Sequence, residues 1–125
     1  GLNGVKLIDD SYNANLHSVK AAIDVLSEES NTRILVLGEL AEAGDSLEEH
    51  YETIGHYAKE KKIDYLYTYG EKSQIAQTKF SKDGQHFTGE EALINTLKSQ
   101  LAPNVTLLVK GSRSAKMENI INQLL

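Results

Sequence analysis

The protein has 125 residues, of which 40% are apolar and 25% charged, the composition of a single globular domain rather than of a disordered chain. The absence of cysteine excludes a disulfide scaffold, thiolate metal ligands and cysteine nucleophiles. The net charge of −5 argues against broad binding to nucleic acid or to an anionic membrane, and no apolar run approaches the roughly 20 residues of a membrane span. The chain begins without methionine or a signal peptide, and we expect it to be a piece of a longer protein.

Strand-like and helix-like patterns alternate along the first half of the chain. A short apolar run at 5–8 predicts a strand, and apolar residues at helical spacing across 19–26 predict a helix after it. A second strand is predicted at 34–37. The looser apolar stripe across 47–58 then predicts a second helix.

The second half continues the alternation. Its predicted elements are a strand at 65–68, a short helix at 73–79, a weaker strand at 85–87, a helix around 93–101, a strand at 105–109 and a helix around 117–124. Capping boxes are predicted at Ser46 with Glu49 and at Thr88 with Glu91. Because this order requires βαβ crossovers, we predict a three-layer α/β domain with an open, mostly parallel, Rossmann-like sheet and helices on both faces.

The residues after each predicted strand are the candidates for function. Ligands of open parallel sheets bind outside the carboxyl ends of the strands. The loops to consider are therefore 9–15, 38–44, 69–72 and 110–114. By topology, these loops are expected to share one edge of the domain.

The first loop is rich in small polar side chains that suit a nucleotide. Asp10 can accept hydrogen bonds from a ribose diol, as acidic residues at strand ends do in nucleotide-binding folds. Tyr12 offers a flat ring to a base, and Asn13 and Asn15 offer paired donors and acceptors. The alternative is that an asparagine only caps the following helix while the aspartates solvate a turn.

The last loop has the features of an anion site. Gly111 lets the backbone approach a ligand closely, and Ser112 or Ser114 can cap a helix starting near residue 115, whose free N–H groups would face the loop. Lys110 and Arg113 add positive charges, and an arginine can bind a carboxylate with two hydrogen bonds. The alternative is a surface turn with solvated charges.

Other chemistries find little support in the sequence. The chain contains neither G-x-x-x-x-G-K-[ST] nor G-x-G-x-x-G, so a nucleotide could be contacted here but not fully cradled. The four histidines lack metal-ligand spacing, and we expect no metal site. Glu39, Glu42 and Asp45 could form an acidic group, although a solvated loop accounts for them more simply.

Three segments carry motifs that resemble those of the Mur ligase family. They are Ile8-Asp9-Asp10-Ser11-Tyr12-Asn13-Ala14-Asn15, then 36–44 with Glu49, His50 and Gly55, and finally Val109-Lys110-Gly111-Ser112-Arg113-Ser114 with Met117 and Glu118. They resemble the C-terminal domain of these enzymes from residue 5 to about 120. The runs Tyr-Asn-Ala-Asn and Lys-Gly-Ser-Arg resemble the MurF type, whereas related ligases carry histidine in the first loop.

The resemblance implies that residues 1–125 are the C-terminal domain of a bacterial cytoplasmic ligase of peptidoglycan synthesis. In this family, ATP with Mg²⁺ phosphorylates the terminal carboxylate of UDP-N-acetylmuramoyl-tripeptide, and the amine of D-alanyl-D-alanine attacks the acyl phosphate. An N-terminal UDP-binding domain and a central ATPase domain, which holds most of the ATP and Mg²⁺ site, have no counterpart in this chain. The chain alone is therefore expected to be inactive.

The resemblance also assigns roles to residues, in a site completed when this domain closes on the central one. The nucleotide-facing set is Asp10, Tyr12, Asn13 and Asn15, and the dipeptide-binding set is Lys110, Ser112 and Arg113. Glu42 and His50 match the middle motif and are expected to orient loops at the cleft, and no catalytic group is expected in this domain. Leu16 stands where proline is common, and Glu39 where aspartate is common.

Two other functions stay open at this point. Folylpolyglutamate synthase has a similar C-terminal domain, but it would predict a histidine where Asn13 and Ala14 stand, and it would not predict the run from Lys110 to Arg113. A non-enzymatic, nucleotide-sensing α/β module would instead predict tight nucleotide binding by this chain alone.

Overall fold

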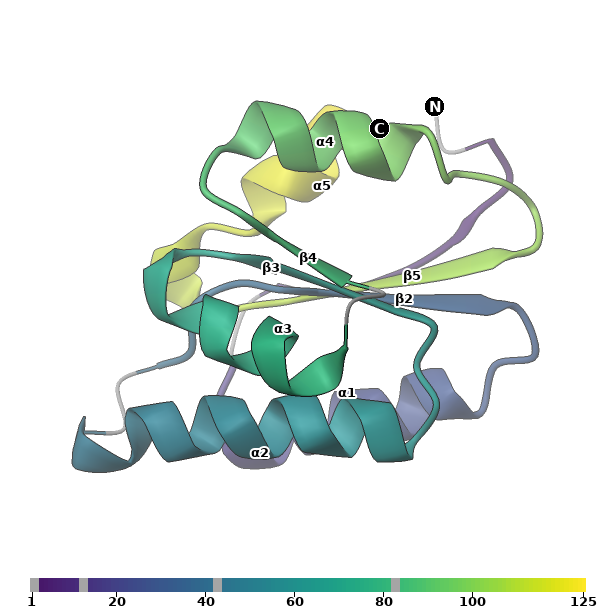
Figure 1. Ribbon diagram of the computed structural model, residues 1–125. Coiled ribbons are helices and arrows are strands. Elements are labelled where there is room, and N and C mark those ends of the chain that lie inside the picture. Colours follow the sequence, from purple (N-terminus) through teal and green to yellow (C-terminus); the bar gives the residue numbers. More distant parts are fainter. Residues whose placement is uncertain (1–2, 12–13, 42–43, 82–83) are drawn as a thin grey trace.

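The computed structural model describes residues 3–11, 14–41, 44–81 and 84–125, which contain one five-stranded parallel sheet (Figure 1). Its strands lie in the order β1-β5-β2-β3-β4. Their bounds are β1 Lys6–Asp10, β2 Thr32–Leu37, β3 Tyr65–Tyr69, β4 Gly84–Phe87 and β5 Val105–Lys110. All the predicted strands are confirmed, and the weaker candidate at 85–87 is the edge strand β4.

In the described residues, five α-helices cover both faces of the sheet. They are α1 Leu16–Ser27, α2 Leu47–Glu60, α3 Gln74–Phe80, α4 Glu90–Lys98 and α5 Glu118–Leu124. Helices α1 to α3 lie below the sheet in Figure 1, and α4 and α5 lie above it. The chain steps in one direction from β1 to β4 and then returns to β5, so right-handed crossovers place α4 on the opposite face. The predicted three-layer, Rossmann-like fold is confirmed.

The strands are almost continuously apolar because both faces of the sheet are buried. Along β2, Leu35 and Leu37 belong to the core formed with α1, α2 and α3, whereas Ile34 and Val36 belong to the core formed with α4 and α5. All four side chains are at most 2% exposed. The apolar stripes predicted for the helices supply the other half of each core.

Both predicted capping boxes are wrong, although the helices they mark exist. Ser46 already has helical φ and ψ angles (−88° and 0°) because a 3-10 turn, Gly44–Ser46, leads directly into α2, and its side chain makes no capping bond. At α4 the capping position is Gly89 rather than Thr88, because the helix begins one residue later than the pattern suggests. Local sequence therefore predicted where helices form better than how they are capped.

Candidate functional site

The carboxyl ends of the strands lie along one edge of the sheet, at the left in Figure 1. Strands β1 and β5 are neighbours, but the chain leaves β1 for α1 on one face and leaves β5 for α5 on the other. Such a divergence opens a crevice at the strand ends, which is the usual ligand site of open α/β sheets. The first and last loops singled out in the sequence flank this crevice.

Backbone hydrogen bonds join the second loop to both of the others. The amide of Ser112 donates to the carbonyl of Glu39, and the amide of Ala41 donates to the carbonyl of Ala14, each at 2.8 Å. Residues 38–41, which we call the bridging segment, therefore connect the first loop to the last. The prediction that these three loops share one edge is confirmed.

The structure pairs two residues that the sequence had placed in separate sets. Asp10 and Lys110 are register partners at the ends of β1 and β5, and the Nζ of Lys110 lies 3.0 Å from the Oδ2 of Asp10. The lysine side chain is 2% exposed, whereas that of the aspartate is 46% exposed. The nucleotide-facing and dipeptide-binding sets therefore meet in an ion pair whose cationic end is buried.

A pocket of 330 Å³ lies beside this ion pair, between α1 and the ends of β1 and β5. The charged pair and Ser18 give the pocket a polar end, while Ala21, Val25 and Leu108 give it an apolar wall. A ligand that entered the crevice on the α1 side would thus meet the aspartate and the lysine together.

Local hydrogen bonds hold the described part of the first loop. The carboxylate of Asp9 accepts from the amide and the hydroxyl of Ser11, at 3.1 and 2.7 Å, and stabilises the turn. Asn15 is the N-cap of α1: its Oδ1 accepts from the amide of Ser18, whose hydroxyl oxygen accepts from the amide of Asn15, both at 2.9 Å. The capping role considered for Asn15 is confirmed, and its nucleotide-facing role stays a prediction.

The side chains of the last loop differ in exposure. Ser112 is 3% exposed, and its hydroxyl oxygen lies 3.1 Å from that of Ser114. Arg113 opens a 3-10 turn, η3 (Arg113–Ala115), and its side chain is exposed. The side chain of Arg113 is therefore accessible to a ligand, whereas that of Ser112 is buried inside the loop.

The helix expected near residue 115 begins later in the structure. After η3, Lys116 adopts a left-handed conformation with φ 53°, and α5 begins only at Glu118. Met117 occupies the capping position, so the prediction that Ser112 or Ser114 caps this helix is wrong. The contribution of this helix end to an anion site stays a prediction, with the helix starting at Glu118 rather than near residue 115.

The buried side chain of Met117 explains two glycines in these loops. Met117 is 0% exposed, and a Cβ on Gly38 would lie 2.5 Å from its Sδ. A Cβ on Gly111 would collide with its Cγ. The sequence suggested that Gly111 admits a ligand, but in the structure this glycine makes room for Met117.

Several predicted residues cannot be placed at the crevice. Tyr12, Asn13 and Glu42 lie outside the described residues, so their roles stay predictions. His50 lies on α2 and is half-buried.

Sequence reasoning missed the neighbouring Tyr51, which is 1% exposed and whose hydroxyl oxygen accepts the amide hydrogen of Leu40 at 2.9 Å. Burial raises the pKa of Tyr51, so the phenol is neutral at physiological pH. The sequence did contain a signal for this hydrogen bond: Tyr51 lies in an apolar stripe, and a buried tyrosine hydroxyl needs a hydrogen-bond partner.

A polar pocket of 260 Å³ continues the same edge toward β3 and β4. Its lining includes Glu39, Tyr69, Gly70, Thr88 and Ser114. Gly70 has φ +110°, a conformation that favours glycine, and a Cβ there would lie 2.5 Å from the Cγ of Glu39, whose side chain would have to move. The bridging segment thus borders this pocket as well as the crevice.

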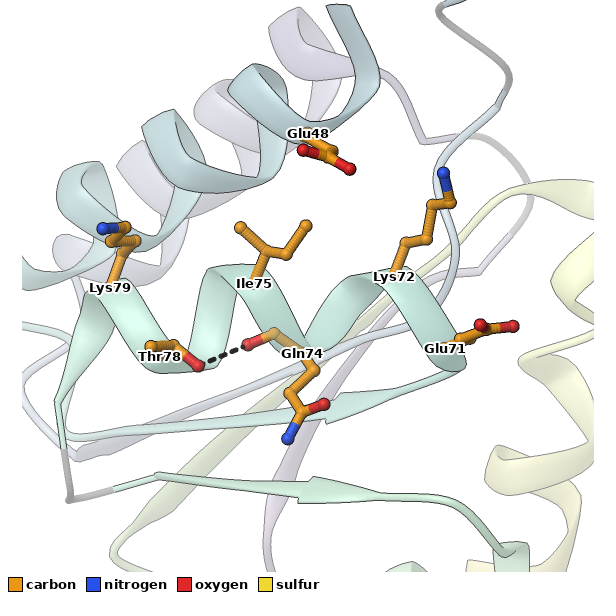
Figure 2. Close-up of a pocket in the computed structure, with 7 residues that line it drawn as sticks. All are labelled: Glu48, Glu71, Lys72, Gln74, Ile75, Thr78 and Lys79. Atoms are coloured by element: carbon orange, nitrogen blue, oxygen red, sulfur yellow. Dashed lines mark hydrogen bonds between the residues drawn. The ribbon is translucent and has the colours of Figure 1, made fainter.

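A third pocket, of 490 Å³, lies between α2 and the segment from Glu71 through α3 (Figure 2). Figure 2 shows Ile75 and Lys72 projecting toward Glu48 of α2, with Lys79 at the far end. Glu71 and Lys72 belong to the candidate loop 69–72, but no residue that was assigned a ligand in the sequence lines this pocket. Its mixed charges single out no class of ligand.

The described part of the chain contains neither a group of metal-ligating side chains nor a membrane-spanning helix. Within residues 3–11, 14–41, 44–81 and 84–125, no three or more His, Asp or Glu side chains are grouped so that they could hold a metal ion. Over the same residues, no helix has both the length and the apolar character needed to cross a bilayer.

Comparison with known proteins gives consistent matches. The family described as "Mur ligase, glutamate ligase domain" matches residues 1–113. The UDP-N-acetylmuramoyl-tripeptide–D-alanyl-D-alanine ligase of Escherichia coli (strain K12) is 43% identical over 120 residues, which cover 94% of this chain and 26% of that protein. The chain thus spans about a quarter of the length of this relative.

Solved structures share the fold. The crystal structure of MurF ligase from Thermotoga maritima in complex with ADP has a TM-score of 0.86 at 22% identity, over 97% of this chain and 28% of that one. A crystal structure of MurF from Acinetobacter baumannii has a TM-score of 0.85 at 28% identity, over 98% of this chain and 28% of that one.

Proposed function

The chain belongs to the Mur ligase family, and from this premise we propose that it is the C-terminal domain of a MurF-type ligase. The complete enzyme would join D-alanyl-D-alanine to UDP-N-acetylmuramoyl-tripeptide through an acyl phosphate formed from ATP. This reaction would supply the peptidoglycan precursor in the bacterial cytoplasm. An N-terminal UDP-binding domain and a central ATPase domain of the same protein would be the partners of this domain.

One observation carries the proposal: the chain is 43% identical to the Escherichia coli ligase over 94% of its length. The crevice supports it independently, because loops from the two ends of the chain meet there. A ligase that couples a nucleotide to a dipeptide needs both half-sites within reach of one reacting carboxylate. The bridging segment links the first loop at Ala14 to the last loop at Ser112, which supports such an arrangement.

Within this proposal, Asp10 faces the nucleotide ribose, with Tyr12, Asn13 and Asn15 beside it. The 3.0 Å ion pair adds a role for Lys110, which holds the Asp10 carboxylate in position at the end of β1. Lys110 therefore supports the nucleotide side of the site as well as the dipeptide side.

On the dipeptide side, Arg113 would bind the carboxylate of D-alanyl-D-alanine, since its side chain is exposed and arginine can donate two parallel hydrogen bonds. Ser112, which is buried, holds the loop to the bridging segment through its amide. Binding the carboxylate at this loop would leave the amine of the dipeptide free to face the central domain.

ATP and Mg²⁺ would be held mainly by the central domain. The chain has no phosphate-binding loop, and its described residues offer no metal-ligand group, so this domain would contact the nucleotide from one side only. Closing the crevice on the central domain would complete the site and keep water away from the acyl phosphate.

The test uses the full-length protein that carries this chain. Purified enzyme is incubated with UDP-N-acetylmuramoyl-tripeptide, ATP, Mg²⁺ and D-alanyl-D-alanine, and the pentapeptide product and released phosphate are measured. We expect both products to depend on D-alanyl-D-alanine, to be lost with L-alanyl-L-alanine, and to be absent when the 125-residue chain replaces the full enzyme.

Other outcomes would overturn the proposal in distinct ways. Phosphate release that depends on folate and glutamate, with no dipeptide product, would assign the protein to the folylpolyglutamate synthases. Tight ATP binding by the 125-residue chain, with no ligation by the full protein, would indicate a nucleotide sensor.

A further inference from the structure

We propose that Tyr51 is a positioning residue for the ligand site: its buried hydroxyl fixes the bridging segment, and through it the nucleotide-facing and dipeptide-binding loops together. The inference rests on the proposed function for its kinetic consequence, but its structural part concerns this chain alone.

The bridging segment depends on Tyr51 for one of its backbone hydrogen bonds. The amide of Leu40 donates to the Oη of Tyr51 at 2.9 Å, and both residues are buried, at 7% and 1% exposure. Water therefore cannot replace the phenol readily as the acceptor. A buried amide without an acceptor is costly, so this hydrogen bond constrains where the segment can lie.

The residues on either side of Leu40 make the contacts that matter for the site. The carbonyl of Glu39 accepts from the amide of Ser112, and the amide of Ala41 donates to the carbonyl of Ala14, both at 2.8 Å. A shift of the segment at Leu40 would therefore disturb the last loop and the first loop at once.

Tyr51 is well suited to act as a fixed support. It lies in the first half of α2, whose Tyr51, Ile54 and Ala58 pack into the core at no more than 1% exposure. A rigid ring on a packed helix loses little conformational freedom in making this bond. The bridging segment is therefore tied to the core by a side chain that does not itself reach the ligands.

The test variant is Tyr51→Phe, and the matched control is Tyr67→Phe. Phenylalanine keeps the buried ring and removes only the hydroxyl, so we expect both variants to fold. Tyr67 is also buried, at 5% exposure, and its hydroxyl donates to the Oε1 of Gln100 at 2.7 Å, in the core that contains α4. Each variant loses one hydroxyl hydrogen bond, which is buried for Tyr51 and partly buried for Tyr67, but of the two hydroxyls only that of Tyr51 bonds to the bridging segment.

The first readout is amide hydrogen exchange in the 125-residue chain. Tyr51→Phe should speed exchange at Leu40, Ala41 and Ser112 by about fivefold or more relative to the slowest core amides, from the loss of one buried hydrogen bond. Tyr67→Phe should leave these three amides unchanged relative to the core. Unchanged exchange at Ala41 and Ser112 in Tyr51→Phe would overturn the structural part of the inference.

The second readout is the steady-state kinetics of the full-length enzyme. Tyr51→Phe should raise KM for ATP and KM for D-alanyl-D-alanine together, by about threefold to tenfold each. In the variant, part of the binding free energy of each ligand would be used to order the loop that contacts it. Tyr67→Phe should keep both KM values within about twofold, the change expected when a distant hydroxyl is lost.

The outcomes separate this inference from the proposed function. If Tyr51→Phe matches Tyr67→Phe in both KM values while wild-type enzyme ligates the dipeptide, the positioning role is overturned and the proposed function stands. If the wild-type enzyme performs no ligation, the proposed function fails together with the kinetic part of this inference. The exchange data would then still decide the coupling between the loops.

Discussion

Burial of the Asp10–Lys110 ion pair is unequal, and so the two single charge removals should differ in their effect on stability. Lys110→Met leaves a carboxylate that is 46% exposed and that water can still solvate. Asp10→Asn instead leaves an ammonium that is 2% exposed without its carboxylate at 3.0 Å. Removing the charge of the exposed Asp10 should therefore cost more stability than removing the charge of the buried Lys110.

The geometry gives the approximate magnitudes. At 3.0 Å and an effective dielectric constant of about 20, the attraction is about 5.5 kcal/mol before desolvation is counted. Desolvation of the ammonium and the partial exposure of the carboxylate offset most of it, so Lys110→Met should lower the free energy of unfolding by about 1 kcal/mol. Asp10→Asn should lower it by about 2–4 kcal/mol, reduced from the cost in a fully buried site because the amide oxygen can still accept.

Urea unfolding of the 125-residue chain measures these differences. The variants are Lys110→Met, Asp10→Asn and the two changes combined. We expect the double variant to be more stable than Asp10→Asn alone, because the second change removes a buried ammonium that has lost its carboxylate at 3.0 Å. The matched control is the exposed pair of Lys79 and Glu52, 3.6 Å apart, where single changes should stay within about 0.5 kcal/mol.

Two results would refute this reasoning. If Lys110→Met cost as much as Asp10→Asn, the unequal burial of the two charges would not govern the pair. If the double variant were the least stable of the three, the two side chains would act independently of their 3.0 Å contact.

Three further predictions follow from the site. In the full-length enzyme, Arg113→Ala should raise KM for D-alanyl-D-alanine about tenfold to hundredfold, through loss of a charged hydrogen bond, with KM for ATP nearly unchanged; an equal rise in both would contradict its assignment. Asn15→Ala should lower the free energy of unfolding by about 1 kcal/mol in urea, whereas Asn15→Ser, which keeps a capping oxygen, should lose much less; equal losses would argue against the cap. Burial lowers the pKa of His86 below its usual 6.5, so the unfolded chain binds the proton more tightly than the folded chain. The free energy of unfolding should therefore fall as pH drops from 7.5 toward 5.5, and His86→Asn should flatten this profile. Parallel profiles for the wild type and the variant would contradict this role of His86.

Much of the fold could be predicted from local patterns. A strand buried on both faces must be apolar almost throughout, and the runs at 34–37 and 105–109 carry that pattern without reference to any other part of the chain. The helices followed from apolar residues at helical spacing for the same reason. The loops were found because strand ends could be located and because their residues carry the motifs of a known family.

Capping and helix starts could not be predicted, because they depend on the path by which the chain enters a helix. The 3-10 turn before α2 gives Ser46 helical angles. Before α5, the turn η3 and the left-handed Lys116 leave Met117 at the capping position. Neither effect is visible in residue type and spacing alone.

The alternation of strands and helices, the fold class and the polar loops could be predicted from the sequence, since they depend on near neighbours along the chain. The position of β5 between β1 and β2, which makes Asp10 and Lys110 neighbours, is seen only in the folded chain. The same is true of the hydrogen bond by which Tyr51 supports the bridging segment. Strand order and buried hydrogen bonds depend on which distant segments pack together, and no local pattern records that choice.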